Sequence, residues 1–240
     1  MTTDRRLYDM DLGRRDHTRW LGSSGRYSTR LTLPTANLLA AYDARLGVTN
    51  VSGACSAWAD QSGNGKHATQ GTAGSRPLIS TADGYASLLF DGTADTLITP
   101  SITATTGVKT IYAVVKQTSV PTSYRTVFSP STLLFGIIPS TGKWGMYDSG
   151  NRDSGITSTT SRTRLAYEQL HSAGNARTWV NGTAGSTHAW LATGNIAGGS
   201  IGAYNSGATH FFAGHLFFLA IYGAAHDSAV EDYITQEWGV

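Results

Sequence analysis

From Leu38 onward the sequence alternates short apolar runs with clusters of Gly, Ser, Thr, Asn and Asp, and this alternation constrains the fold more than any other feature. The runs are rich in β-branched and aromatic residues, as strands are, and the clusters between them are typical of turns. About ten runs qualify as strands: Leu38–Asp43, Leu88–Phe90, Thr110–Lys116, Arg125–Phe128, Leu133–Ile138, Lys143–Tyr147, Leu165–Leu170, Arg177–Val180, Ser200–Tyr204 and His215–Tyr222. Many short strands, almost without a helical period, favour two sheets packed face to face. The sequence therefore predicts an all-β fold, a two-sheet antiparallel jelly-roll sandwich over residues 34–240, preceded by an extended N-terminal arm.

Three segments carry more detailed predictions. The run Thr110–Lys116 is apolar almost throughout, which indicates a strand covered on both faces. The run Arg177–Val180 leads into Asn-Gly at 181–182, a dipeptide that takes positive φ at low cost and so predicts a tight hairpin turn. Residues 47–76 are rich in Gly, Ser and Asn, and we expect a long loop there that carries Trp58.

A single helix is predicted at the end of the chain. Ser228 and Glu231 have the spacing of a capping box, in which the serine oxygen and the glutamate carboxylate accept backbone N–H groups of the first turn. The apolar positions recur every fourth residue on one face: Val230, Ile234 and Trp238. Gly239 then supplies a stop signal. We expect this short helix to pack Trp238 onto the sandwich.

The first 33 residues differ in composition from the rest. Residues 1–30 hold seven Arg against four Asp, whereas the remainder has eleven Lys or Arg against twelve Asp or Glu. Weak periodicity and several glycines predict an extended arm, either free or docked on a partner. If the arm docks, its anchoring residues are expected among the arginines and apolar side chains: Arg5, Arg6, Leu7, Tyr8, Arg14, Arg15 and Trp20.

Charge and cysteine content exclude several classes of partner. A formal net charge of +2 is too small for a general nucleic-acid or membrane footprint. Cys55 is the only cysteine, which excludes an intrachain disulfide and a thiolate metal cluster within one chain. No run approaches the roughly 18 apolar residues of a membrane span. No apolar stretch follows the first six residues, so no signal peptide is visible and we expect synthesis in the cytoplasm.

The order of these segments resembles the concanavalin-A-like lectin and glucanase superfamily, and within it the laminin-G-like modules of phage virion and bacterial surface proteins. The resemblance covers roughly residues 36–240 and is carried by the order and spacing of its motifs: Trp58–Gly65 with Ala68–Gln70, Leu89–Gly92, Thr110–Lys116, Trp179–Gly182, Ile201–Ala203, Phe212–Gly214, Tyr222 and Ser228–Gly239. It implies a jelly-roll of two stacked sheets that binds glycans or proteins through its concave face or rim loops.

Catalysis is not expected. Glucanases of that superfamily carry a Glu-x-Asp-x-x-Glu strand, in which two carboxylates on one side of the strand act as nucleophile and as acid and base. Glutamate occurs here only at Glu168, Glu231 and Glu237, and the last two belong to the predicted helix. The sequence therefore predicts a protein that is not an enzyme, and a hydrolase would need an unrecognised arrangement of acids.

One segment combines the residue types of a glycan site. Such a site needs an exposed aromatic face for the apolar side of a sugar ring, with amide or charged groups for the hydroxyls. The candidates lie on a strand-to-loop segment and on one later strand end: Trp144, Tyr147, Asp148, Asn151, Arg152, Tyr204 and Asn205. Trp144 and Tyr147 are three residues apart, so they point to opposite faces of a regular strand, and we expect at most one of them to be buried in a sheet interface.

Calcium is the one metal for which candidates remain. Relatives in the superfamily sometimes hold it with loop oxygens, and Asp60, Asn64 and Asp91 could supply them. The alternative is that these side chains cap turns, which Asp and Asn favour for local hydrogen-bonding reasons.

Three hypotheses for function follow. The first is a non-catalytic virion protein of a phage, made in the host cytoplasm, anchored to other virion proteins by its arm, assembled as a homo-oligomer or larger complex, and presenting a glycan- or protein-binding sandwich. The second is a free lectin-like module at the cell surface or outside the cell. The third is a glycan hydrolase without the usual carboxylates. Fold resemblance alone does not choose among them.

Overall fold

The computed structural model describes residues 19–21, 27–29, 31–102, 108–121, 123–130, 133–139, 141–148, 150–170, 174–189, 198–204 and 207–240. The chain divides into two units, Met1–Leu33 and Pro34–Val240. In the first unit, β1 (Arg19–Leu21) pairs antiparallel with β2 (Tyr27–Thr29). Of the anchoring residues predicted for the arm, Trp20 lies in β1. The other six fall outside the described residues, and anchoring stays a prediction: Arg5, Arg6, Leu7, Tyr8, Arg14 and Arg15.

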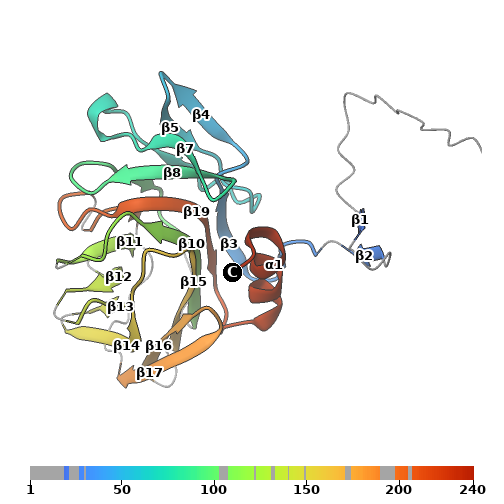
Figure 1. Cartoon of the computed structure of the whole chain (residues 1–240), viewed down its shortest axis with the longest axis vertical. Coiled ribbons are helices and arrows are strands. Elements are labelled where there is room, and N and C mark those ends of the chain that lie inside the picture. Colours follow the sequence, from blue (N-terminus) through green and yellow to red (C-terminus); the bar gives the residue numbers. More distant parts are fainter. Residues whose placement is uncertain are drawn as a thin grey trace, which may run out of the picture. The chain divides into compact units, whose positions relative to one another are not determined.

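The second unit is built from antiparallel strands and one short helix at its end, which confirms the predicted fold class (Figure 1). Its elements are β3 (Leu38–Asp43), β4 (Val48–Val51), β5 (Ala54–Trp58), β6 (Ala68–Thr69), the 3-10 turn η1 (Ala73–Ser75), β7 (Leu78–Ala82), β8 (Tyr85–Asp91), β9 (Leu97–Thr99), β10 (Lys109–Gln117), β11 (Arg125–Pro130), β12 (Leu134–Ile138), β13 (Lys143–Tyr147), β14 (Asn151–Thr157), β15 (Thr163–Leu170), β16 (Asn175–Val180), β17 (Thr183–Ala189), β18 (Gly199–Ile201), β19 (Ala213–Tyr222) and α1 (Ser228–Trp238).

The strands form one continuous sheet that folds into two facing layers. One layer has the order β17-β16-β15-β10-β19-β8-β7, with β3 also paired to β19. Strands β5, β6 and β9 carry the pairing round one edge to the second layer, β18-β11-β12-β13-β14. At the other edge β14 meets β17, where the Nε2 atom of His188 lies 2.6 Å from the carbonyl oxygen of Asp153. The sandwich is therefore nearly closed.

The core lies between the two layers and is rich in aromatic side chains. Trp58, Trp144, Phe90, Phe128 and Phe212 are each at most 1% exposed. The central strand β10 is buried along its middle: Ile111, Ala113 and Val115 face the core, and on the other face Tyr112 contacts Asp227 at the start of α1. This confirms the prediction that the apolar run in β10 is covered on both faces.

Turn chemistry agrees with the sequence at one hairpin, but a predicted loop is wrong. Asn181 and Gly182 have φ of 48° and 78° and join β16 to β17 as a two-residue turn, as predicted. Residues 47–76 were expected to form a loop, yet they contain β4, β5 and β6. Trp58 ends β5 with a fully buried ring, and its indole N–H donates to the carbonyl oxygen of Asp43 at 2.9 Å. This hydrogen bond satisfies the polar atom of the indole inside the core.

The N-cap of helix α1 is one residue earlier than the sequence predicts. Asp227 is the N-cap and accepts a hydrogen bond from the N–H of Ala229 at 2.9 Å, so the predicted capping box of Ser228 and Glu231 is wrong. Glu231 points instead toward Arg164 on β15. The rest of the prediction is confirmed: the apolar positions are buried, and Gly239 ends the helix with φ of 65°.

Replacing Asp227 by alanine should lower the free energy of unfolding by about 1 kcal/mol, because the first turn loses its side-chain acceptor. The matched control is Ser228→Ala, which removes a hydroxyl one residue along and should change stability by less than about 0.5 kcal/mol. Chemical denaturation of both variants decides the point. If Ser228→Ala lowered the free energy of unfolding as much as Asp227→Ala or more, Ser228 would be the capping residue.

Among the described residues, no helix has both the length and the apolar character needed to cross a membrane.

Candidate functional site

Four aromatic side chains meet at one edge of the second layer, and we call them the aromatic cluster: Tyr124, Tyr147, Tyr204 and His210. The ring of Tyr124 packs edge-on against Tyr147, with centroids 5.7 Å apart. His210 stacks on Tyr124 at 4.9 Å and on Tyr204 at 5.4 Å. The three tyrosines are half-buried and His210 is exposed. The cluster therefore presents aromatic surface to solvent.

Separate parts of the chain position these rings. Tyr147 ends β13, and Tyr124 immediately precedes β11. Tyr204 and Thr209 face each other across a short hairpin, in which the N–H of Tyr204 donates to the carbonyl oxygen of Thr209 at 2.8 Å. His210 follows this hairpin with φ of 55°, an uncommon conformation for a residue with a side chain. Its carbonyl oxygen accepts the N–H of Thr126 at 3.0 Å, which fixes the hairpin beside β11.

The polar groups around the rings are neutral. The hydroxyl of Tyr124 donates to Oδ1 of Asn151 at 2.7 Å, and Asn151 is the cross-strand partner of Tyr147. Burial, followed by the nearby hydroxyls of Tyr147 and Tyr124, raises the pKa of Tyr204 above its ordinary value. The rings stacked on His210 exclude water from part of its imidazole, and this burial lowers its pKa, favouring the neutral form.

The uncharged residues proposed from the sequence divide into three groups. Tyr147, Asn151 and Tyr204 come together in or beside the aromatic cluster, while Asn205 lies outside the described residues. Trp144 is only 1% exposed and belongs to the core, so its ring offers no face to a ligand.

The two charged candidates, Asp148 and Arg152, form an ion pair of 3.2 Å in which the Asp148 side chain is 1% exposed. Arg152 lies opposite the core residue Met146 in the register of β13 and β14, whereas Asn151 lies opposite Tyr147. The pleat therefore directs Arg152 and Asn151 to different faces of the sheet.

Sequence reasoning missed Tyr124 and His210. Tyr124 follows the Thr-Ser-Val-Pro-Thr-Ser segment, which has no periodicity, and His210 lies in a segment where no Asp or Glu suggests a site. The only local signal was an isolated aromatic residue in a turn-rich stretch. Their importance comes from tertiary contacts with residues far away in the chain.

Two of the three calcium candidates, Asp60 and Asp91, accept backbone N–H groups at turns, and Asn64 bonds to the backbone at the start of β3. Oxygens of Asp60 accept the N–H groups of Ala41, Ser62 and Lys66 at 2.9 Å each. The Asn64 amide nitrogen donates to the carbonyl oxygens of Leu38 and Leu39.

Asp91 accepts the N–H groups of Thr93, Ala94 and Asp95. Burial alone would raise the pKa of Asp91, but these hydrogen bonds and that of the Thr93 hydroxyl lower it to about 2. Backbone donors thus occupy the oxygens that a cation would need. Within the described ranges, no group of three His, Cys, Asp or Glu residues is arranged to hold a metal ion.

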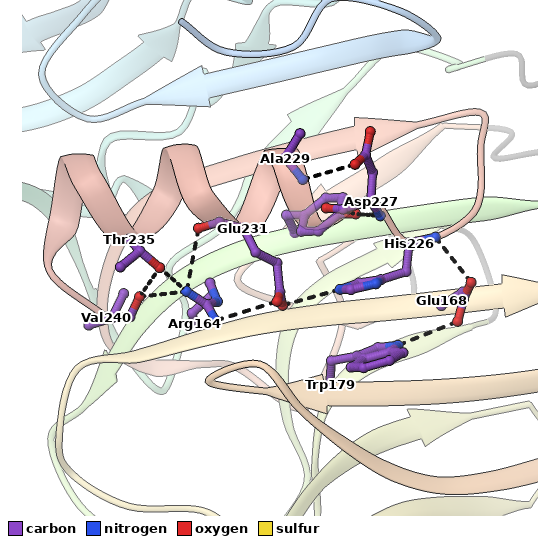
Figure 2. A network of polar contacts seen from close by, with 10 residues as sticks. Arg164, Glu168, Trp179, His226, Asp227, Ala229, Glu231, Thr235 and Val240 are labelled. Atoms are coloured by element: carbon purple, nitrogen blue, oxygen red, sulfur yellow. Dashed lines mark hydrogen bonds and ion pairs between the residues drawn. The ribbon is translucent and has the colours of Figure 1, made fainter. Parts of the chain in front are cut away.

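A second polar cluster, which we call the α1 network, joins the terminal helix to β15 and β16 (Figure 2). The guanidinium of Arg164 on β15 lies 3.4 Å from Oε2 of Glu231 and donates to the carbonyl oxygen of Val240 at 2.7 Å. It also donates to the hydroxyl of Thr235. The other oxygen of Glu231 lies 3.2 Å from Nε2 of His226. The guanidinium of Arg164 thereby contacts helix α1 at Glu231 and Thr235 and the chain just beyond the helix at Val240.

Glu168 completes the α1 network from the middle of β15. Its Oε1 accepts the backbone N–H of His226 at 3.0 Å, and its Oε2 accepts the indole N–H of Trp179 at 3.4 Å. The ring of His226 stacks on Trp179 with centroids 4.1 Å apart and planes only 5° from parallel. Figure 2 shows the histidine and the indole lying face to face below the helix.

This cluster contains two carboxylates and a histidine, the residue types of acid and base catalysis, but its contacts indicate a structural role. Three of the four oxygens of Glu168 and Glu231 accept hydrogen bonds from Trp179, His226 or Arg164, whereas Oε1 of Glu231 lies 3.2 Å from Nε2 of His226 without a hydrogen bond. Both residues are less than a tenth exposed. A glycosidase pair must instead flank a sugar with one acid free to donate its proton.

Comparison with known proteins gives the fold. No protein-family model matches the chain, and no curated protein matches it in sequence. Among solved structures, domain 4 of an extracellular arabinanase from Geobacillus stearothermophilus, in complex with arabinotriose, is similar with a TM-score of 0.59 and 17% identity over 82% of this chain and 98% of that domain.

Two larger proteins are similar over part of their length. A sialidase of Trypanosoma rangeli, in complex with sialic acid, has a TM-score of 0.60 and 13% identity over 92% of this chain but only 36% of its own. A mutant of HCR D/C VPI 5995 has a TM-score of 0.58 and 10% identity over 84% of this chain and 53% of its own. This chain thus spans about a third of the sialidase. These likenesses show the fold alone, a β-sandwich that takes up most of the chain.

Proposed function

We propose that the unit Pro34–Val240 is a non-catalytic carbohydrate-binding module of the concanavalin-A-like type, and that it binds a glycan at the aromatic cluster. The observation that carries the proposal is the convergence of partly exposed aromatic rings and uncharged hydrogen-bonding groups at one edge of the sandwich. Aromatic rings cover the apolar side of a sugar, and a few fixed polar groups orient its hydroxyls.

The geometry is held in place before any ligand arrives. The hydroxyl of Tyr124 is fixed by Asn151, and His210 is fixed by its backbone bond to Thr126 and by two stacked rings. A preformed site loses less conformational entropy on binding than a flexible one. The fold likeness to an arabinanase domain solved with arabinotriose supports the same function by analogy.

Hydrolysis has less support than binding. Both carboxylates of the α1 network are buried, Glu231 is paired with Arg164 and Glu168 accepts two N–H groups, while the carboxylates of Asp60 and Asp91 cap turns. Display on a virion through residues 1–33 stays a prediction, and so does the alternative of a free module outside the cell. The comparisons include carbohydrate-associated proteins and favour the second of these over the first.

The test is binding of the full chain to a glycan array, followed by calorimetry on the best ligand. Tyr147→Ala and Tyr204→Ala should each weaken binding about tenfold or more, because each removes an aromatic contact at the centre of the site. The matched control is Tyr85→Ala, a half-buried tyrosine of β8 whose ring contacts Arg162 instead of the aromatic cluster. It should leave affinity unchanged.

Two results would overturn the proposal. One is an array on which the folded wild-type chain binds no glycan. The other is a glycan affinity that Tyr147→Ala and Tyr204→Ala leave intact while circular dichroism shows both variants to be folded.

A further inference from the structure

We infer that the aromatic cluster selects uncharged glycans over acidic ones, an inference that rests on the proposed function. A site for a sialylated or uronic glycan needs a cation placed for the carboxylate, normally an arginine that donates two parallel hydrogen bonds. The aromatic cluster instead combines phenol hydroxyls, the Asn151 amide and the His210 imidazole, whose pKa is lowered by partial burial against two rings.

The loops that build the cluster carry no charged residue apart from the histidine. Residues 118–124 and 198–214 contain no Asp, Glu, Lys or Arg. These two segments supply three of the four rings. The neighbouring strands β11, β13 and β14 do carry charged residues.

The described charged side chains of those strands have partners. Arg152 pairs with Asp148 at 3.2 Å, and Lys143 pairs with Asp153 at 3.5 Å. Arg125, next to Tyr124 in the sequence, donates from Nη1 to the carbonyl oxygens of Gly92 and Phe211 at 3.1 and 2.9 Å. A ligand carboxylate would have to compete with these contacts for a cation.

The rings themselves oppose an anion. The face of an aromatic ring carries the negative part of its quadrupole, so a carboxylate placed on it gains no attraction. Removing a carboxylate from water without a partner costs much more than removing a hydroxyl that finds one. The same surface therefore favours a ligand whose polar groups are all hydroxyls.

Matched ligand pairs test the inference. The neutral members are lactose, galactotriose and cellohexaose, and the acidic members are sialyllactose, trigalacturonic acid and cellohexaose oxidised at C6 to glucuronate. We expect the full chain to bind a neutral member at least about tenfold more tightly than its acidic partner. Binding of the neutral ligand should change less than about twofold between about 0.1 M and about 1 M salt, because screening acts on charge pairs.

Adding a positive charge to the site should weaken the preference for neutral glycans. Asn151→Lys places a cation beside Tyr124 and should shift the preference toward the acidic partner by about tenfold, whereas Asn151→Gln should not.

The outcomes separate this inference from the proposed function. Tighter, salt-sensitive binding of acidic partners, lost in Tyr147→Ala, would overturn neutral selectivity and leave the glycan site standing. Absence of binding to both the probes and the array would overturn both. Tighter binding of the neutral partner, insensitive to salt and lost in Tyr147→Ala, is the expected result.

Discussion

Replacing Arg164 by methionine should lower the free energy of unfolding by about 3–5 kcal/mol, because it leaves the carboxylate of Glu231 buried without its cation. Arg164 and Glu231 are each 8% exposed, so water does not replace the lost partner. The same change removes the hydrogen bonds from β15 to Thr235 and to the carbonyl oxygen of Val240. Helix α1 would then be held mainly by its apolar face. Urea denaturation at neutral pH measures the loss.

Two further variants distinguish the buried pair from a general effect of losing an arginine. Arg177→Met removes a more exposed guanidinium on β16, which bonds to Thr187, and should cost less than about 1 kcal/mol. Adding Glu231→Gln to Arg164→Met should recover part of the loss, since the unpaired buried charge disappears. If Arg164→Met and Arg177→Met cost the same, or if the double variant is less stable than Arg164→Met, the α1 network does not work as described.

The sandwich was predictable wherever a strand is buried and apolar. The runs in β10 and β19 are almost wholly buried, and their sequences are continuous in apolar residues. Strands β4 and β14 escaped prediction because most of their side chains are exposed or half-buried, so the sequence shows no alternation there. The sequence predicts a loop at β5 because most residues of this strand are small, such as Ala54 and Ser56, and form no apolar run.

The candidate site was predictable only in part, for a geometric reason. Tyr147 and Asn151 lie on adjacent strands joined by a short turn, and local sequence brings such residues together. Tyr124 and His210 are some 86 residues apart in the sequence, yet their rings stack. The neighbouring hydrogen bond from Arg125 to Phe211 spans the same sequence separation. A local sequence pattern cannot predict a contact between residues so far apart in the sequence.

The helix cap shows a similar limit at short range. Both Asp227 and Ser228 are good capping residues, and the sequence favoured Ser228 because Glu231 follows at the right spacing. The choice was decided by Arg164, which lies 67 residues away from Glu231 and engages its carboxylate. Because Glu231 pairs with Arg164 on β15, its carboxylate does not form the hydrogen bond of a capping box.

Replacing Trp144 by alanine should also cost about 3–5 kcal/mol of stability, because it empties a large volume in a closed core. The indole is 1% exposed and belongs to the same cluster as Ile137, its partner across the strands, and Met146. A binding residue at the surface would behave in the opposite way, with lost affinity and nearly unchanged stability. Trp144→Phe should retain most of the stability by filling part of the space.

The decisive comparison is between Trp144→Ala and Tyr147→Ala, which lie three residues apart on the same strand and on opposite faces of it. The tryptophan variant should unfold at a lower temperature, yet its folded molecules should bind the glycan with wild-type affinity, because no described ring of the aromatic cluster touches Trp144. The tyrosine variant should keep its melting temperature within a few degrees and lose the affinity. If both variants lost melting temperature and glycan affinity to the same extent, the two faces of β13 would not separate the core from the binding site. Trp144 would then belong to the glycan site.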